Sequence, residues 1–568
     1  MEVFGQRLSD GYFKTGDKDT EIVYKVEKIT NGYKISGKIR GKLGRIKVFE
    51  IQRPKGALYL NNWQSWGLFL SEEEYKGVIE GYKERKIGIY TYTPIPYIFK
   101  EELISDYFLL GEDILLGFLT SKIAHPFYIV KDNVLEGWLE YFDTEFDDYI
   151  PIESFVILTS SPHYILLGIY SDLVKKENGI RVNNVNPIGW SSWYQYFLDL
   201  KWKDILENLE LSKKMNMPYE VFQIDDGYEK DIGDWFSTKE GFPGVKEMAK
   251  IIEGYGYTPG IWTAPLSISE TSQIYKENKG WLVKENDTPK KAYYNWERDI
   301  YALDITVPEA KNWLYNLFSK LKEAGFNYFK IDFLFAGALP GMRKENITPI
   351  QAYRDALSTI RRAVGDSFIL GCGAPLLPSL GIVDGMRIGP DTAPFWKKDE
   401  KKSDINAYWA LKNSITRWFM HKKWWMNDPD CLLLRPKDTD LLPTQRKLYG
   451  VVSAILDNMI IQSDNLSYIT EEEKALLKEV LSYREGRPKV KFIDKDLFTL
   501  SVEGSGRGNV EIAVNLDEKP AIYEKREIPP FSYIPIKEDE EGIRLSKKPI
   551  KREDGRIFTY YGKEERDN

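Results

Sequence analysis

The first 182 residues alternate hydrophobic and polar positions in the manner of β-strands. Segments such as TEIVYKVEKI (20–29) and GYKISGKI (32–39) show the pattern, and NG, GKLG and RPKG sequences separate such segments as turns. We find no convincing long helix in this part of the chain. The pattern therefore predicts an N-terminal β-sandwich domain over residues 1–182.

From residue 183 to residue 484 the pattern changes to short strands that alternate with amphipathic helices. Apolar residues recur at helical spacing, and several helical segments begin after Thr, Pro or Asp. Eight such β/α units predict a (β/α)8 TIM barrel. The predicted strands are 186–193, 219–226, 257–264, 327–333, 367–373, 385–391, 423–428 and 458–464.

Residues 485–568 return to strand patterns. KVKFID, LFTLSVEG, NVEIAVNL, AIYEKRE and FSYIPIKE each read as one strand, with Gly and Pro turns between them. We expect a small C-terminal β-sandwich. The fold class predicted for the whole chain is multidomain, α/β plus β, with the barrel between two β domains.

Composition excludes several classes of function. The net charge of the 568 residues is −7 with both signs spread along the chain, which argues against a nucleic-acid binder. No run of 18 apolar residues occurs, and charges stand where a signal peptide would have its apolar core, so we expect no membrane contact and a cytoplasmic location. Abundant Lys, Glu, Ile and Tyr are typical of a thermophile.

The sequence offers no metal or cofactor motif. Two cysteines, Cys372 and Cys431, cannot form a disulfide framework, and their spacing fits no zinc motif. The three histidines lie far apart, and no HExxH, GxGxxG after a strand, or GxxxxGK[ST] is present. We therefore expect neither metal nor cofactor.

In a TIM barrel, residues at the carboxyl ends of the strands face the active site. Here those ends combine carboxylates with Trp and Tyr, which a sugar site requires: carboxylates accept hydroxyl hydrogens, aromatic rings cover the C–H face of the sugar, and two carboxyl groups can cleave a glycosidic bond. The residues at these ends are Trp190, Trp193, Tyr194, Asp225, Asp226, Trp262, Lys330, Asp332, Cys372, Arg387, Asp391, Asn427, Asp428, Asp430 and Asp464.

Each candidate also has a structural interpretation. Lys330 and Asp332 share one face of their strand, so they form either a structural ion pair or a pair in which Lys330 keeps Asp332 ionised. A single Asp at a strand end is often a cap or loop tether, and Asp391 could simply form a turn after Gly389-Pro390. Core packing or loop stabilisation is the corresponding alternative for Cys372, Trp190, Trp296 and residues 428–430.

A set of motifs gives the chain a family resemblance. GWSSWYQYF, FQIDDGYEKDIGDW, GIWTAP, FKIDFLFAGA, GCGAPL and MRIGPDTAPFW occur in this order and resemble the α-galactosidases of glycoside hydrolase family 36. NNWQSWG, SKIAHPF, EYFDTEFDD and WMNDPDCL resemble them as well. The resemblance covers most of the chain, up to about residue 480, and is strongest toward the compact enzymes of thermophiles.

The resemblance implies a retaining exo-α-galactosidase acting on terminal, mainly α-1,6-linked, galactose of melibiose- and raffinose-type sugars. It implies Asp332, in KxD, as the nucleophile and Asp391, in RxGxD, as the acid/base residue. Relatives commonly have Cys where this chain has Ser191. The positions that match the galactose subsite are Trp66, Trp193, Tyr194, Asp225, Asp226, Trp262, Lys330, Cys372 and Arg387.

Alternatives remain within and outside this class. A galactosyl-transferring synthase or an α-N-acetylgalactosaminidase would use the same fold, although Cys372 leans toward plain galactose. A non-catalytic sugar-binding protein is disfavoured by the presence of both Asp332 and Asp391. In NNWQSWG, we expect Trp66 to cover the sugar and Trp63 to pack in the N-terminal core. A homo-oligomer is possible.

Overall fold

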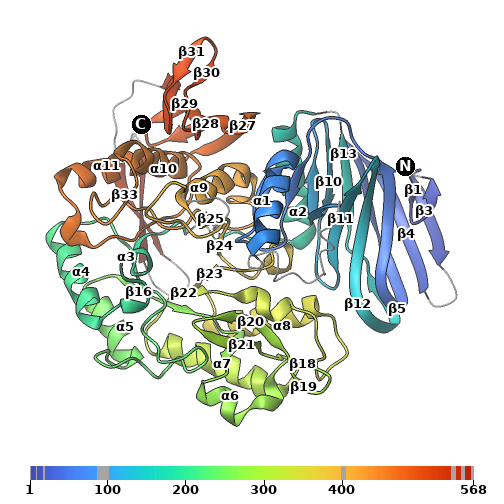
Figure 1. Ribbon diagram of the computed structural model, residues 1–568, viewed down its shortest axis with the longest axis horizontal. Helices are drawn as coiled ribbons and strands as arrows, with labels where there is room; N and C mark the ends of the chain where they lie inside the picture. Colours follow the sequence, from blue (N-terminus) through green and yellow to red (C-terminus); the bar gives the residue numbers. More distant parts are fainter. Residues whose placement is uncertain are drawn as a thin grey trace.

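The computed structural model describes residues 2–7, 9–16, 20–85, 102–159, 161–183, 185–397, 405–538, 545–551 and 557–563. A large antiparallel sheet lies beside a barrel of parallel strands, and a smaller group of strands lies above the barrel in the view of Figure 1. The predicted fold class, a barrel flanked by β domains, is confirmed. Among the described residues, no helix has the length and apolar character needed to cross a membrane.

The N-terminal sheet contains β1 to β13 and pairs its strands antiparallel. Its central strands are long because alternation continues over many residues: β5 and β12 run beside one another for most of their length. The strands are β1 (Glu2–Val3), β2 (Gln6–Arg7), β3 (Gly11–Gly16), β4 (Thr20–Ile29), β5 (Gly32–Gln52), β6 (Tyr59–Asn61), β7 (Phe69–Ser71), β8 (Leu103–Asp106), β9 (Phe108–Leu110), β10 (Ile114–Phe118), β11 (His125–Lys131), β12 (Val134–Pro151) and β13 (Phe155–Thr159).

The GKLG sequence at 41–44 is not a turn, contrary to the prediction. The chain passes through it as part of β5. The bend lies in the partner strand β12, whose Phe142 and Asp143 have positive φ angles of 60° and 55° and interrupt the register. Such a bulge lets the sheet twist without ending the strand, so the glycines accommodate a bulge rather than a reversal.

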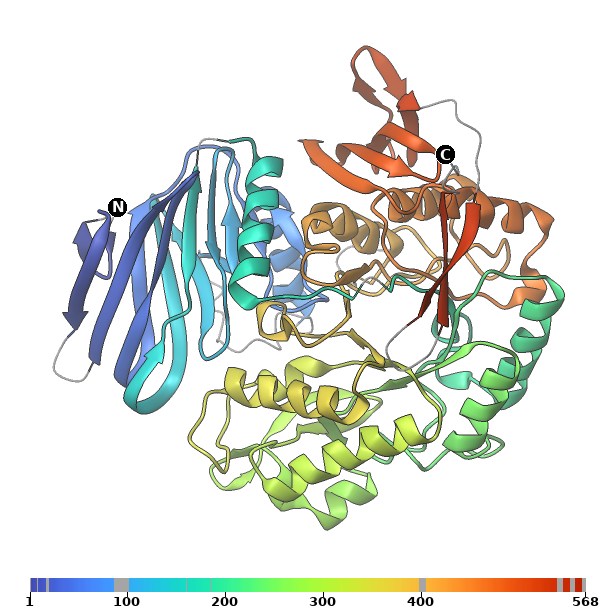
Figure 2. The same cartoon turned by 180° about the vertical axis from the view of Figure 1, so that it is seen from behind.

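Two helices in this part of the chain also contradict the prediction that it contains none. Helix α1 (Glu72–Arg85) begins where Ser71 N and Oγ donate to Glu74 Oε2 at 3.2 and 2.8 Å, a reciprocal cap. Helix α2 (His163–Asn178) ends at Gly179, whose φ of 59° is left-handed. Both helices lie between the sheet and the barrel (Figure 1 and Figure 2), so their positions are fixed by tertiary packing.

The barrel sheet has eight parallel strands, each within the span predicted for it. Its two end strands, β25 and β26, meet through Leu432, whose N–H donates to Ile461 O at 2.7 Å. The strands are β14 (Ile188–Ser191), β15 (Val221–Ile224), β16 (Thr258–Thr263), β22 (Tyr328–Ile331), β23 (Phe368–Gly371), β24 (Gly385–Arg387), β25 (Met426–Asp428) and β26 (Ile460–Gln462). The helices are α3 (Trp193–Tyr196), α4 (Trp202–Lys214), α5 (Val245–Gly254), α7 (Pro308–Glu323), α8 (Pro349–Val364), α9 (Ala407–Thr416), α10 (Pro443–Ile455) and α11 (Glu471–Leu481).

One of the eight predicted helices is missing. The chain between β23 and β24 forms only the short 3-10 turn η5 (Leu377–Ser379). Here the barrel contacts the N-terminal domain: Ser65 N donates to Ala374 O at 2.8 Å, and Leu376 N donates to Trp63 O at 3.0 Å. Backbone pairing with another domain therefore replaces the usual covering helix at this point of the barrel wall.

A small β structure is inserted between β16 and α7. It contains β17 (Ser267–Ser269), α6 (Gln273–Glu277), β18 (Lys284–Glu285), β19 (Thr288–Pro289), β20 (Lys291–Asn295) and β21 (Arg298–Ala302). Strands β17, β21 and β20 form one antiparallel sheet, which includes part of the YALD segment at 301–304. The turn between β20 and β21 carries Trp296 and Glu297, both with positive φ.

The C-terminal domain has a four-stranded sheet and two hairpins. AIYEKRE, predicted as one strand, is a hairpin, because Glu524 and Lys525 take positive φ angles of 48° and 66°. The sheet consists of β27 (Arg487–Asp494), β28 (Leu497–Ser505), β29 (Gly508–Asn515) and β32 (Ser532–Glu538), and the hairpins of β30 (Ala521–Tyr523) with β31 (Arg526–Ile528) and β33 (Leu545–Lys551) with β34 (Ile557–Lys563).

All three domains meet at one buried lysine of α9. Lys412 pairs with Glu74 of the N-terminal domain and, at 3.1 Å, with Asp496 of the C-terminal domain. The Lys412 side chain is 2% exposed. A buried ammonium requires such partners, because an unpaired charge in the interior is strongly destabilising.

Candidate active site

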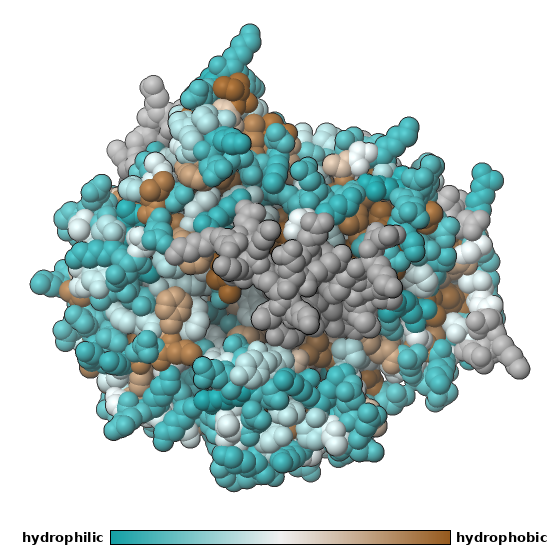
Figure 3. Space-filling model, in the orientation of Figure 1, coloured by the Kyte–Doolittle hydropathy of each residue, from teal (hydrophilic) through white to brown (hydrophobic). Residues whose placement is uncertain are grey.

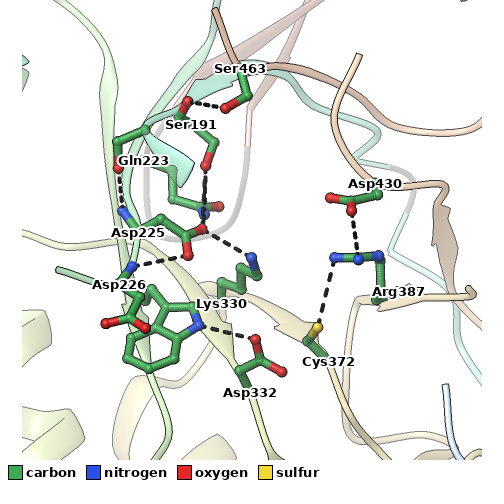
Figure 4. Close-up of polar contacts among 12 residues, drawn as sticks. Ser191, Gln223, Asp225, Asp226, Lys330, Asp332, Cys372, Arg387, Asp430 and Ser463 are labelled. Carbon is green, nitrogen blue, oxygen red and sulfur yellow. Dashed lines mark hydrogen bonds and ion pairs between the residues drawn. The ribbon is translucent and has the colours of Figure 1, made fainter. Parts of the chain in front are cut away.

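Polar side chains from several barrel strands meet at the carboxyl ends of those strands. Figure 4 shows Asp225 and Asp226 on one side of Asp332, and Cys372, Arg387 and Asp430 on the other. Figure 3 shows a hollow in the face of the molecule over the barrel. Within the described ranges, no group of three or more His, Cys, Asp or Glu side chains is arranged to hold a metal ion.

Asp225 is the best-connected carboxylate of the site. Its Oδ2 accepts hydrogen bonds from Lys330 Nζ at 2.9 Å, from Ser191 Oγ at 3.3 Å and from Gln223 Nε2. Its backbone N–H donates to Ser192 Oγ at 2.9 Å. Asp225 is 1% exposed, so this network fixes the carboxylate rigidly at the end of β15.

The ion pair of Lys330 is with Asp225, two strands away, and not the predicted pair along its own strand. Burial opposes the charged ammonium, but Asp225, together with Cys372 and Asp332, outweighs burial and raises the pKa of Lys330 well above its usual value. Asp332 thus lies in the field of Lys330 without being its direct partner. Both side chains do reach the same site, as their spacing predicts.

Asp332 follows β22 directly and is held from two sides. Trp262 Nε1 donates to its Oδ2 at 3.1 Å, and the backbone N–H of Phe333 donates to its Oδ1 at 2.8 Å. The next residue, Phe333, has a left-handed φ of 50°, which is uncommon for a bulky residue. This sharp bend directs the backbone N–H of Phe333 at the carboxylate.

Arg387 joins Asp391 and Asp430. Its Nη2 lies 2.5 Å from Asp391 Oδ1 and 2.6 Å from Asp430 Oδ2. The arginine side chain is 1% exposed, whereas Asp391 keeps 30% of its side-chain surface. Asp391 therefore combines a fixed position with access to the hollow.

The surroundings of Asp391 favour its protonated form. Burial raises the pKa of Asp391, Arg387 lowers it, and the charges of Asp430 and Asp332 raise it again, with a result of about 6. A carboxyl group with this pKa can deliver a proton near neutral pH and take one back.

Tyr194 and Trp193 come from the short helix α3. The hydroxyl of Tyr194 donates to Asp430, and Arg387 Nη2 lies 3.5 Å from the same hydroxyl. Tyr194 is buried, while Trp193 is half-buried and packs its ring edge-to-face on Phe197 at 5.2 Å. Trp190, by contrast, is a core residue: it is fully buried and stacks on Phe222 at 4.3 Å.

Asp226 contacts two residues that the sequence analysis did not assign to the site. Trp296 Nε1, from the inserted β structure, donates to Asp226 Oδ2 at 2.8 Å. Glu229 also shares a hydrogen bond with Asp226, and burial and the Asp226 charge raise the pKa of Glu229 well above its usual value. The close Asp226–Glu229 spacing offered a signal for Glu229, but Trp296 lies 70 residues away and gave none.

Trp66 reaches the site from the N-terminal domain. Its Nε1 donates to Cys372 Sγ at 3.2 Å, and its ring meets Phe333 edge-to-face at 4.8 Å. Arg387 Nη1 lies 3.9 Å from the same sulfur. Trp63 is fully buried in the N-terminal domain, edge-to-face with His125 at 6.1 Å.

The remaining strand-end residues serve the barrel. Asp464 is fully buried and pairs with Arg435 at 3.0 Å, and the Arg435 guanidinium in turn donates to the carbonyl of Tyr194 at 2.9 Å. Asp428 Oδ1 accepts the N–H of Asp430 at 2.9 Å, which stabilises the loop as predicted for this motif. Asp430 itself is a wall of the site, since it holds Arg387 and Tyr194.

Two family models match adjacent segments of the chain. Residues 25–159 match the N-terminal domain of α-galactosidases, and residues 166–345 match melibiase. Among characterised relatives, α-galactosidase 1 of Pediococcus pentosaceus is 25% identical over 195 residues, 32% of this chain, and α-galactosidase of Escherichia coli is 24% identical over 159 residues, 26% of this chain. These alignments span 25% and 21% of the relatives' own lengths.

Solved structures share the fold over a longer stretch. The α-galactosidase TtGalA of Thermus thermophilus has a TM-score of 0.66 at 24% identity, covering 86% of this chain and 98% of that one. The GH36 α-galactosidase AgaA of Geobacillus stearothermophilus has a TM-score of 0.64 at 13% identity, covering 97% of this chain and 79% of that one. In its sequence, in its N-terminal domain and in its barrel, this chain resembles the α-galactosidases of glycoside hydrolase family 36.

Proposed function

We propose that the chain is a retaining exo-α-galactosidase that hydrolyses terminal, mainly α-1,6-linked, galactose of melibiose- and raffinose-type oligosaccharides. The family models and the fold support α-galactosidase activity. TtGalA, with the same fold, has been solved with p-nitrophenyl α-D-galactopyranoside and with stachyose, which supports galactose-containing oligosaccharides as the substrate class.

Asp332 is the proposed nucleophile. An ionised carboxylate accepts hydrogen bonds and donates none, and both oxygens of Asp332 receive a donor, from Trp262 and Phe333. Its attack on the anomeric carbon forms a C–O bond while the glycosidic C–O bond breaks. The product of this step is a covalent β-galactosyl-enzyme.

Asp391 is the proposed acid and base. Its proton passes to the glycosidic oxygen as the leaving group departs. The resulting carboxylate then takes a proton from water, which attacks the anomeric carbon, breaks the bond to Asp332 and releases α-galactose. The observation that carries the proposal is the difference between the two carboxyl groups: Asp332 holds two hydrogen-bond donors, whereas the pKa of Asp391 is raised to about 6.

Galactose recognition is proposed for the other side of the site. Asp225 and Asp226 accept hydrogen bonds from the 4- and 6-hydroxyls, and Trp262 lies beside the ring. Because both carboxylates are buried and fixed by Lys330 and Trp296, an epimer that leaves them unpaired is rejected. Trp193, Tyr194, Cys372, Arg387 and Trp66 complete the proposed subsite.

The test is a panel of p-nitrophenyl α-glycosides followed by proton NMR of the first sugar released from the galactoside. We expect galactose release, with α-galactose formed first and β-galactose appearing only by mutarotation. The panel includes the α-xyloside, because an α-xylosidase of Lactiplantibacillus pentosus is 26% identical over 156 residues, and the α-N-acetylgalactosaminide. Early β-galactose would contradict the retaining mechanism, and preference for another glycoside would contradict the substrate.

Further proposals follow from the sequence. The products formed at high galactoside concentration separate hydrolysis from galactosyl transfer. We also propose domains at 1–182, 183–484 and 485–568, a cytoplasmic location and a thermophilic source. The change from antiparallel to parallel pairing between β13 and β14 supports the first of these boundaries.

A further inference from the structure

The backbone on both sides of Trp66 is held by two barrel side chains. Asn413 lies in α9 and Arg417 follows directly after it. Arg417 Nη1 donates to the carbonyl oxygen of Ser65 at 3.1 Å, and Asn413 Nδ2 donates to that of Gly67 at 3.0 Å. The loop that brings Trp66 to the site is therefore fixed from the barrel side.

The same two side chains also hold the segment that carries Asp391. Arg417 Nη1 and Asn413 Nδ2 both donate to the carbonyl oxygen of Ile388, at 3.1 and 2.5 Å. Ile388 follows Arg387, the ion-pair partner of Asp391. One pair of side chains thus contacts the N-terminal loop and the strand end after β24 at once.

Burial makes this connection rigid. Arg417 is fully buried and Asn413 is 1% exposed. Arg417 also donates to Asn61 Oδ1 at 2.8 Å from Nη2 and 3.2 Å from Nε, and Asn413 Oδ1 accepts the N–H of Phe69 at 2.8 Å. A planar guanidinium with several fixed acceptors has little freedom, and buried donors that lose their acceptors are costly, so the two loops cannot move independently at low cost.

We propose that Arg417 and Asn413 are positioning residues that place Trp66 and Asp391 on opposite sides of one sugar site. They act through the carbonyls of Ser65, Gly67 and Ile388 and not by touching substrate. The inference rests on the proposed function and deepens it, because it makes the N-terminal domain a precondition for the geometry of the acid/base residue.

The test compares two disrupting variants with a matched control. Asn413→Ala removes the links to Gly67 and Ile388, and Arg417→Lys keeps the charge but loses the forked geometry. The control is Tyr408→Phe on the same helix, which removes a buried hydrogen bond of 2.6 Å to Asp496 and contacts neither loop carbonyl. Thermal unfolding of each variant ensures that kcat and KM for p-nitrophenyl α-galactoside are compared on folded protein.

We expect kcat/KM to fall on the order of 10- to 100-fold in both disrupting variants, with kcat lowered and KM raised, because small displacements of catalytic groups have effects of this size. The control keeps wild-type kcat and KM whatever its loss of thermal stability. A double-mutant cycle with Trp66→Ala gives the specific readout: Asn413→Ala should cost less in the Trp66→Ala background than in the wild type.

Two results separate the inference from the function on which it rests. An active wild type whose Asn413→Ala variant retains full kcat/KM, or shows strictly additive effects with Trp66→Ala and an unchanged kcat, overturns the positioning role alone. A wild type that releases no galactose from any galactoside overturns the proposed function and the positioning role with it.

Discussion

Lys330 donates to Asp225 at 2.9 Å, although Asp332 lies two positions along its own strand. The pair is buried, with side chains 8% and 2% exposed, so removal of the ammonium leaves a buried charge uncompensated. We expect Lys330→Met to lower the free energy of unfolding by about 3–5 kcal/mol. Urea unfolding measures this loss.

A second variant identifies the cause. Lys330→Met combined with Asp225→Leu removes both charges, and should recover much of the stability but none of the activity on galactosides. If the double variant is as unstable as Lys330→Met, packing and not charge explains the loss.

The roles of the two carboxyl groups can be read from trapped products. Asp332→Gly should abolish activity on natural substrates, whereas Asp391→Gly should spare more activity on substrates with good leaving groups, because these need the acid less. With azide, Asp391→Gly should yield β-galactosyl azide and Asp332→Gly α-galactosyl azide. Exchange of the two anomers between the variants would reverse the assignment.

The raised pKa of Asp391 predicts the alkaline limb of the pH profile. The proton needed on the glycosidic oxygen is present below about pH 6 and is lost above it, so kcat/KM should decline as pH rises through about 6. In Asp391→Gly, assayed on a substrate with a good leaving group, this limb should disappear.

A control is needed because burial also raises the pKa of Asp428 to about 6. In Asp428→Asn the alkaline limb should persist. Loss of the limb in Asp428→Asn, with retention in Asp391→Gly, would assign the titration to the wrong carboxyl group.

Trp66 and Trp63 are close in sequence but differ in surroundings. Trp63 is fully buried, so Trp63→Ala should lower the free energy of unfolding by about 3–5 kcal/mol. Trp66 contacts Cys372 and Phe333 at the site, so Trp66→Ala should instead weaken transition-state binding by about 1–3 kcal/mol. Thermal unfolding and kcat/KM on both variants check this, and full kcat/KM in Trp66→Ala would refute the role of Trp66.

Trp296 fixes Asp226 by one hydrogen bond of 2.8 Å. Trp296→Phe keeps an aromatic ring but removes the donor, so KM for galactosides should rise by about tenfold, which corresponds to roughly 1.4 kcal/mol, while thermal stability stays within about 1 kcal/mol of the wild type. Tyr294→Phe in the same insertion serves as the control, since Tyr294 is 58% exposed. An unchanged KM in Trp296→Phe would remove Trp296 from the site.

The parts of the fold that the sequence predicts are those with a regular pattern. The eight barrel strands lie where alternating strand and helix signals place them. Helix α2 was missed although Leu166, Leu167, Tyr170 and Val174 are buried at helical spacing, because its Ile, Leu and Tyr content also suits a strand. The helix absent between β23 and β24 has no local signal, since the N-terminal domain determines the chain there.

The same division applies to the site. Lys330, Asp332 and Arg387 follow from the rule that strand ends meet at one face of the barrel. The partner of Lys330 does not follow, because spacing along a strand says nothing about contacts across it. Trp296 reaches Asp226 from an inserted sheet, and such long-range contacts are set by packing.

The junction at Lys412 bears on how this protein can be divided or recombined. One ammonium group is paired with carboxylates of both flanking domains, Glu74 and Asp496. A truncation at either domain boundary therefore leaves a charge stranded in the barrel wall, and an exchange of one domain with a relative must carry a compatible residue at this position. The barrel holds the proposed catalytic carboxyl groups, but it is not a portable catalytic module.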